Sequence, residues 1–269
     1  MQSDKARFHD HSHAREYDRK AAESDIRAQL TPRLVEAVGC KGGEWVLDLA
    51  TGTGRFARPV AQSLKGGKII GLDEALAMLR VAQEQEGKEP IPGFLCAAGA
   101  AEGFPFRAGV FDRVFTVFAL HHFGHPPLTM REAWRVLKPR GRFVILDPVV
   151  ATAEDSLDEA IHDLINRILR SAHGDDFHYH SLEDIQDLLT RAGFRVIRAD
   201  LHTFSVDQDG MEGIPTGRHW LEIAKQLQEE SPELRRRFQE KYFCYEMKGE
   251  KPHVRGKFGF ALVCGEKLP

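Results

Sequence analysis

Short apolar runs alternate with helix-like segments through the first 150 residues, and this alternation constrains the fold more than any other feature of the sequence. Strands joined by helices of this length form parallel βαβ units, in which helices cover both faces of the sheet. The sequence therefore predicts an α/β fold with a doubly wound, mostly parallel sheet. The expected strands are residues 44–50, 68–73, 93–99, 110–120 and 142–149, and the expected helices are 55–64, 75–86 and 127–136.

The regular alternation weakens after Pro148, although two further strands are expected. Residues 194–204 form the sixth, and the alternating pattern near the C-terminus indicates a seventh that pairs antiparallel at the sheet edge. The expected organisation is an N-terminal helical segment (1–40), a core (41–204) with an insertion (149–181), a helical insertion or lid (205–256) and the final edge strand (257–269).

Composition and charge exclude several classes of partner and location. Lys and Arg number 37 against 40 Asp and Glu, a net charge of −3, which does not favour nucleic acid. No apolar run reaches the ~18 residues that a membrane span needs, and the polar N-terminus is unlike a secretory signal. The four cysteines show no paired spacing, so we expect free thiols in a cytoplasmic protein and no bound metal.

A glycine turn after the first strand carries the clearest chemical signal. The segment VLDLATGTGRFA (46–57) places Asp48 on the strand, and Gly52 and Gly54 where the strand passes into a helix. Glycine lets the backbone approach a ligand closely, and the helix N-terminus offers unpaired N–H groups. Asp73 stands 19 residues after Gly54, at the end of the second strand, where a carboxylate accepts both hydroxyls of a ribose. These features predict a cleft for an adenosine-containing cofactor.

Two classes of cofactor fit such a cleft. Gly52, Gly54 and Ala57 satisfy the dinucleotide pattern G-x-G-x-x-G/A, so a NAD(P)-dependent reductase is one alternative, and a catalytically silent cofactor-binding module is another. A dinucleotide places an anionic pyrophosphate on the turn, which Asp48 would repel. S-adenosyl-L-methionine instead carries a sulfonium and an ammonium that a carboxylate attracts, and its own carboxylate can use N–H groups of the turn. Asp48 therefore favours S-adenosyl-L-methionine.

Several separated motifs extend this interpretation. In chain order they are VLDLATGTG (46–54), GLDEALAML (71–79), GAAEGFPF (99–106), FDRVFTVFALHHF (111–123) and LKPRGRFVILDP (137–148). Together they resemble the class I S-adenosylmethionine-dependent methyltransferases, especially the family that includes the quinone-biosynthesis C-methyltransferases. The resemblance spans about residues 44–148, and it implies a Rossmann-like sheet and methyl transfer to a small molecule.

The resemblance also implies which residues contact the cofactor. Those near the glycine turn would meet the methionine part, Asp73 would hold the ribose, and Met78 would border the adenine. Ala100 and Ala75 depart from the pattern, because many relatives have an acidic residue and a Ser or Thr there. The twelve implied cofactor-binding residues are Asp48, Ala50, Thr51, Gly52, Gly54, Asp73, Glu74, Met78, Ala100, Ala101, Phe118 and Ala119.

Two adjacent histidines are the candidates for catalysis. His121 and His122 follow the fourth strand at the carboxyl edge of the sheet, where ligands bind in open α/β folds. A histidine can act as general base if the acceptor carries a proton that must leave, although this position in the resembling family is often structural. Residues 173–180, with three further histidines, follow in a loop that commonly lines the acceptor pocket in that family.

The nature of the acceptor stays open in the sequence. Enzymes of this fold that methylate amino groups on nucleic-acid bases carry D/N-P-P-Y/F after the fourth strand, whereas this chain has Phe118, Ala119, Leu120 and His121. Aromatic residues in 149–181 and 205–256 suggest either a lid over a small aromatic or apolar acceptor or a local core. The prediction is O-, N- or C-methylation of a small molecule.

Overall fold

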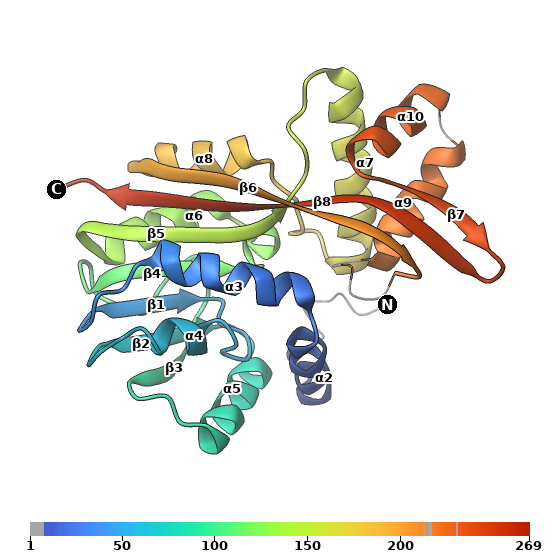
Figure 1. The fold of residues 1–269 in the computed structure, drawn as a ribbon. Coiled ribbons are helices and arrows are strands. Elements are labelled where there is room, and N and C mark those ends of the chain that lie inside the picture. The colour runs from blue at the N-terminus through green and yellow to red at the C-terminus, as the bar shows by residue number, and fades with distance from the viewer. Residues whose placement is uncertain (1–7, 212–213, 215–216, 230) are drawn as a thin grey trace.

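One mixed sheet forms the centre of the molecule (Figure 1). The computed structural model describes residues 8–211, 214, 217–229 and 231–269. The strands are β1 (Trp45–Leu49), β2 (Lys68–Asp73), β3 (Phe94–Ala98), β4 (Phe111–Val117), β5 (Leu137–Val149), β6 (Phe194–Asp209), β7 (Phe243–Lys248) and β8 (Lys251–Lys267). Their order is β3-β2-β1-β4-β5-β8-β6, with β7 paired to β8 outside this path. β1 to β5 pair in parallel, whereas β8 is antiparallel to β5, β6 and β7.

The predicted fold class is confirmed, with differences in detail. The seven expected strands form the path of the sheet, and β7 is an eighth that the sequence did not reveal. The antiparallel strand β8 lies between β5 and β6, so β6 forms the outer edge. β6 runs to Asp209 and β8 begins at Lys251, so both strands enter the segment expected to be helical. β6 and β8 continue as strands over this length because they pair with each other, and antiparallel pairing forms backbone hydrogen bonds between the two strands.

Helices pack on both faces of the sheet (Figure 1). In β1, Val46 and Leu47 point to opposite faces and join different apolar clusters, as the alternation of side chains along a strand requires. Among the described residues, no helix is both long and apolar enough to cross a membrane. The helices are α2 (His11–Ala22), α3 (Asp25–Val38), α4 (Ala57–Ala61), α5 (Leu76–Lys88), η1 (Leu120–His122, 3₁₀), α6 (Pro126–Val136), α7 (Ser156–His173), α8 (Leu182–Arg191), α9 (Gly217–Glu229) and α10 (Pro232–Lys241).

Local sequence explains where several helices begin and end. The Ser24 side chain caps α3 by accepting from the Arg27 backbone N–H, and Gly39 closes the helix in the left-handed conformation at φ 59°. Ser181 and Asp184 form a capping box at the start of α8. α4 is shorter than the ten-residue helix expected over 55–64. It begins at Ala57, since Pro59 lacks the N–H that would bond the Arg55 carbonyl in a helix that began there.

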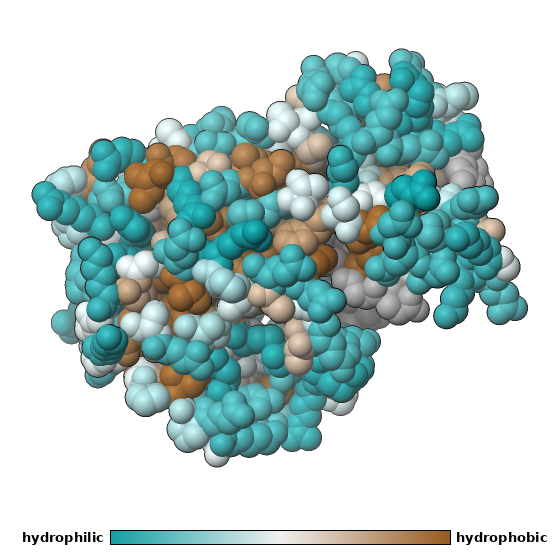
Figure 2. Space-filling model, viewed as in Figure 1, coloured by the Kyte–Doolittle hydropathy of each residue, from teal (hydrophilic) through white to brown (hydrophobic). Residues whose placement is uncertain are grey.

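A cap formed by α7, α9, α10, β7 and the first half of β8 stands beyond the end of the sheet (Figure 1). Its interior holds a cluster of aromatic rings, and Trp220 lies at the centre of that cluster, with its ring centroid 5.5 Å from that of Tyr242 and 5.6 Å from that of Phe258. The outward surface around α7 and α10 is mostly hydrophilic (Figure 2). Most aromatic residues of segment 205–256, which the sequence left open between a lid and a local core, therefore pack in a core inside the cap.

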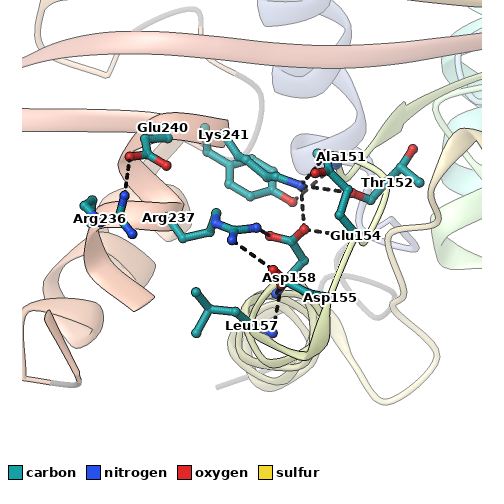
Figure 3. A network of polar contacts seen from close by, with 11 residues as sticks. Ala151, Thr152, Glu154, Asp155, Leu157, Asp158, Arg236, Arg237, Glu240 and Lys241 are labelled. Carbon is teal, nitrogen blue, oxygen red and sulfur yellow. Dashed lines mark hydrogen bonds and ion pairs between the residues drawn. The ribbon is translucent and has the colours of Figure 1, made fainter. Parts of the chain in front are cut away.

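A buried carboxylate joins two helices of the cap (Figure 3). Asp158 on α7 is fully buried, and its carboxylate oxygens lie 2.5 Å from Nζ of Lys241 and 3.1 Å from a guanidinium nitrogen of Arg237, both on α10. The Glu154 backbone N–H donates to the same carboxylate at 2.9 Å. A carboxylate held by two cations and a backbone donor has its desolvation compensated, so it fixes α10 against α7.

Replacing Asp158 with Asn should destabilise the protein by about 3 kcal/mol, because two cations at the helix interface then lose their anionic partner. Urea unfolding followed by circular dichroism measures this change. The control is Asp187→Asn on α8, whose side chain is 70% exposed and pairs loosely with Arg191, so its effect should stay within about 0.5 kcal/mol. Equal effects of the two substitutions would contradict the structural role of Asp158.

Candidate active site

The carboxyl ends of β1, β2, β4 and β5 open into one cavity of about 780 Å³. Residues of α2, α3, α7, the 173–180 loop and the cap complete its wall. Of the twelve residues expected to bind a cofactor, ten line this cavity, as do His121 and His122. The ten are Asp48, Ala50, Thr51, Gly52, Asp73, Glu74, Met78, Ala101, Phe118 and Ala119.

Gly54 and Ala100 are outside the lining of the cavity. A Cβ added to Gly54 would lie 3.2 Å from the Phe94 ring, and the backbone there has φ 75°, so this glycine permits a tight turn against β3. Ala100 is exposed at the end of the β3 loop, while its neighbours Ala101 and Glu102 line the cavity. The two glycines of the turn thus differ: Gly54 packs against the Phe94 ring, whereas Gly52 faces the cavity.

The backbone is strained where two strands enter the site. Ala50 after β1 and Phe118 after β4 adopt positive φ angles of 56° and 54°, which residues with a Cβ rarely take. Both residues line the cavity. Strain of this kind persists where the surrounding structure imposes it, and it is concentrated at functional sites. The two turns therefore bring backbone groups of neighbouring strands to one surface.

Two aspartates lie side by side at the base of the cavity. Asp48 is buried, and one carboxylate oxygen accepts from the Thr51 hydroxyl at 2.7 Å. Burial raises the pKa of Asp48 to about 8, and the Asp73 charge adds to this effect. Asp73 accepts from the backbone N–H groups of Gly52 and Ala75, each at 2.8 Å, while its burial raises its pKa. The base of the site therefore holds two carboxyl groups whose ionised forms a cationic ligand would stabilise.

The N-terminal helix α2 covers this base. Asp18 on α2 is buried, and its carboxylate accepts from Thr53 and Arg55 of the glycine turn, each at 2.7 Å, and from Gln85 of α5 at 3.0 Å. These bonds join three segments that are far apart in the sequence. α2 lies within residues 1–40, which were expected to be helical, and its buried residues Ala14, Asp18 and Ala21 recur at helical spacing. α2 depends on the core, since its own apolar surface is small.

Arg27 is a cation in the wall that the sequence motifs did not indicate, and it differs from Lys20 and Arg55, which pair with Glu16 and Asp18. Its guanidinium lies 5.2 Å from the Tyr17 ring centroid and 4.9 Å from that of Phe118, and it donates to the Tyr17 hydroxyl at 3.1 Å. No carboxylate within the described part of the chain forms an ion pair with it. The faces of these two aromatic rings stabilise the guanidinium and hold it beside the turn that follows β4. An anionic group of a ligand would complete its coordination.

Histidines and aromatic rings form the opposite wall. His173 at the end of α7 lies 3.2 Å from His219 of α9, measured between Nε2 and Nδ1, and its ring stacks on Phe177. His122 contacts Phe177 edge-on at a centroid distance of 5.3 Å. The predicted loop 173–180 thus contributes His173, Phe177 and Tyr179 to the cavity, while His178 and His180 pack against each other outside its lining.

His121 is held by a buried acid on β5. Its Nδ1 lies 2.8 Å from Oδ2 of Asp147, and its backbone N–H donates to the same oxygen at 3.1 Å. Burial lowers the pKa of His121 to about 3 and raises the pKa of Asp147 to about 8. Asp147 lies in the motif LKPRGRFVILDP, but sequence spacing alone could not pair it with His121. Of the two histidines predicted as catalytic candidates, His121 is therefore the one whose ring is hydrogen-bonded to a buried carboxylate.

Comparison with known proteins agrees with this geometry. Residues 47–145 match the family model described as "Methyltransferase domain". The chain is 37% identical over 114 residues to a demethylmenaquinone methyltransferase of Renibacterium salmoninarum, covering 42% of this chain and 45% of that protein. It is 30% identical over 140 residues to the uncharacterized methyltransferase YcgJ of Bacillus subtilis, covering 52% and 54%. The chain spans about half the length of these curated relatives.

The same fold is found in solved structures. The crystal structure of YcgJ superposes with a TM-score of 0.71 at 22% identity, covering 90% of this chain and 99% of that one. A putative methyltransferase of Bacillus halodurans gives the same score and identity, covering 89% and 99%. Residues 47–145 are therefore similar in sequence to a methyltransferase domain, and the fold of the chain is that of these two solved structures. The similarity to a demethylmenaquinone methyltransferase agrees with the resemblance that the motifs indicated.

Removing the Asp18 carboxylate should loosen α2 while leaving the core intact, because three hydrogen bonds of this side chain attach the helix. In Asp18→Ala, amides of α2 should exchange with deuterium on the order of tenfold faster, and those of β1 and β4 should not change. Glu16→Ala is the control on the same helix, since Glu16 pairs only with neighbours on α2 among the described ion pairs. Unchanged exchange in Asp18→Ala would show that other contacts hold α2.

Proposed function

We propose that the protein is an enzyme that transfers a methyl group from S-adenosyl-L-methionine to a small-molecule acceptor. The observation that carries the proposal is Asp48, a buried cavity carboxylate that has no ion pair among the described side chains. A carboxylate in this position attracts the sulfonium and ammonium of S-adenosyl-L-methionine and repels a pyrophosphate. This favours the methyltransferase over the NAD(P)-dependent reductase.

Other predicted residues that line the cavity fit the rest of that cofactor. Asp73 accepts one backbone N–H on each oxygen, and each oxygen keeps a lone pair that a ribose hydroxyl can use. Met78 and Ala101 supply apolar surface for the adenine. Because the Gly52 N–H already donates to Asp73, we assign the cofactor carboxylate to Arg27 instead of the glycine turn.

The cofactor, when bound, supplies a methyl group activated by a positive sulfur. The chain's own contribution is to orient the acceptor and to exclude water. The helices α2 and α3 and the cap supply this enclosure in the proposal, since α2 covers the glycine turn and His219 of α9 reaches the cavity. The acceptor lies against the wall of His122, His173, Phe177 and Tyr179, and this wall suits a flat aromatic or apolar molecule.

The state of the cysteines supports a location in the cytoplasm. All four, namely Cys40, Cys96, Cys244 and Cys264, are free thiols. Disulfides form readily in oxidising compartments and rarely in the cytosol. Burial raises the pKa of Cys40, Cys96 and Cys264 to about 11, so these thiols resist ionisation and oxidation.

Isothermal titration calorimetry with three ligands tests the function. We expect S-adenosyl-L-methionine and S-adenosylhomocysteine to bind and NADPH not to bind. An acceptor panel of phenols, amines and enolic ketones, followed by release of S-adenosylhomocysteine, then tests catalysis. Binding of NADPH alone would support the reductase, and cofactor binding without transfer to any acceptor would support the silent module.

Arg27→Gln should weaken S-adenosylhomocysteine binding by about 10- to 100-fold, because a charge-assisted hydrogen bond to the carboxylate is lost. The affinity for 5′-methylthioadenosine, which lacks the amino-acid part, should not change. Calorimetry with both ligands measures the difference, and Arg33→Gln, an exposed change on the same helix, is the control. An equal loss for both ligands would place Arg27 away from the carboxylate.

The affinity for S-adenosyl-L-methionine should rise with pH between about 6 and 9, on the order of tenfold. Burial raises the pKa of Asp48 to about 8, so the group is mostly neutral below that pH and anionic above it, and only the anion attracts the cationic ligand. Calorimetry across this range measures the trend. Asp48→Asn should flatten it, and an equally steep profile in that variant would assign the dependence to another group.

A further inference from the structure

Asp147 and His121 form a buried pair whose histidine borders the cavity. The carboxylate is 1% exposed and bonds both Nδ1 and the backbone N–H of His121. No protein partner within the described residues occupies the opposite ring nitrogen, Nε2. Rings of His122, Phe177 and Tyr179 surround the imidazole at centroid distances of 4.2, 5.1 and 5.3 Å, so its orientation is fixed.

We propose that Asp147 is a positioning residue that holds His121 so that its Nε2 removes a proton from the methyl acceptor. This inference rests on the proposed function and adds the acceptor class: a molecule whose methylated group carries an acidic O–H or N–H. A carboxylate behind an imidazole fixes the tautomer with Nδ1 protonated and stabilises the imidazolium that forms. The buried Asp147 has no other assigned role in the site.

The transfer balances without a redox partner. The O–H or N–H bond of the acceptor breaks, and its proton moves to Nε2 of His121. The freed electron pair forms the bond to the methyl carbon, and the pair of the broken carbon–sulfur bond stays on sulfur. His121 leaves the step as an imidazolium paired with Asp147, and it returns the proton to solvent when the product leaves.

Burial gives this pair a pH dependence. Burial raises the pKa of Asp147 and so favours its protonated form, in which the pair holds one more proton than the base needs. As pH rises the pair loses one proton, and the form with Nδ1 protonated and Nε2 bare increases. The groups that face the pair are His122 of η1, His173 of α7, Arg27 of α3 and His180 before α8. Of these, Arg27 and His173 act to lower the pKa of His121.

A phenol whose anion absorbs at longer wavelength tests the proton transfer without turnover. The probe is 2-naphthol at pH 8.5, where a phenol with a pKa near 10 is mostly un-ionised in water. Bound to the S-adenosylhomocysteine complex of the wild type, it should show the band of the anion. His121→Gln should bind the probe with an affinity within about threefold of the wild type, and it should lose the anion band. Asp147→Asn should reduce the band on the order of tenfold and remove its pH dependence between about pH 7 and 9.

The control is His162→Gln on α7, a half-buried histidine outside the cavity lining, which should keep the wild-type band. Absence of the anion band in the wild type, or an equal band in His121→Gln, overturns the proposal. If His121→Gln loses its native circular dichroism spectrum, the test rests on Asp147→Asn. A pH dependence of the anion band like that of the wild type in Asp147→Asn then overturns the proposal. Cofactor affinity is measured in parallel, so a wild type that binds no S-adenosylhomocysteine contradicts the proposed function separately.

Discussion

Antiparallel pairing along β8 is the interaction on which the rest of the structure depends. Its second half pairs with β5 in the core, from Arg142 opposite Glu266 to Val149 opposite Gly259, and its first half pairs with β7 in the cap. β8 passes from the cap into the core near Phe260, which pairs with Pro148 at the end of β5, and both residues line the cavity. A single unbroken strand thus sets the cap at a constant position over the carboxyl edge of the sheet. The buried pair of Asp158 with Lys241 and Arg237 then fixes the cap internally.

Three carboxylates of the site, of which Asp48 and Asp147 are buried and Asp73 is half-buried, differ in the donors that reach them. Asp48 receives a hydroxyl, Asp73 two backbone N–H groups, and Asp147 an imidazole together with a backbone N–H. Burial raises the pKa of each above its ordinary value, to about 8 for Asp48 and Asp147. All three stand at the carboxyl ends of strands, where a parallel sheet gathers them at one edge. The fold therefore gathers carboxyl groups where a cationic cofactor is proposed to bind.

Local patterns in the sequence predicted the sheet, because strand periodicity and the glycine turn depend on neighbouring residues. They also predicted ten of the residues that line the cavity, since those residues follow strands in fixed motifs. Patterns could not show that Asp18 reaches Thr53 or that Asp147 reaches His121, because these pairs form only when the chain is folded. β7 was hidden for the same reason: the strand FCYEMK is short and half exposed, and its pairing with β8 determines its structure.

The position of β8 between β5 and β6 has a consequence for how the protein is made. The pairs that close the core sheet join residues more than 100 positions apart, such as Arg142 and Glu266, so their formation carries a large loop-closure entropy. During synthesis, the edge of β5 stays without its partner until β8 has left the ribosome. An apolar strand with unpaired backbone groups is prone to aggregate, so nascent chains of this protein should depend on chaperones at β5 more than at β1 or β2, which gain their neighbours early.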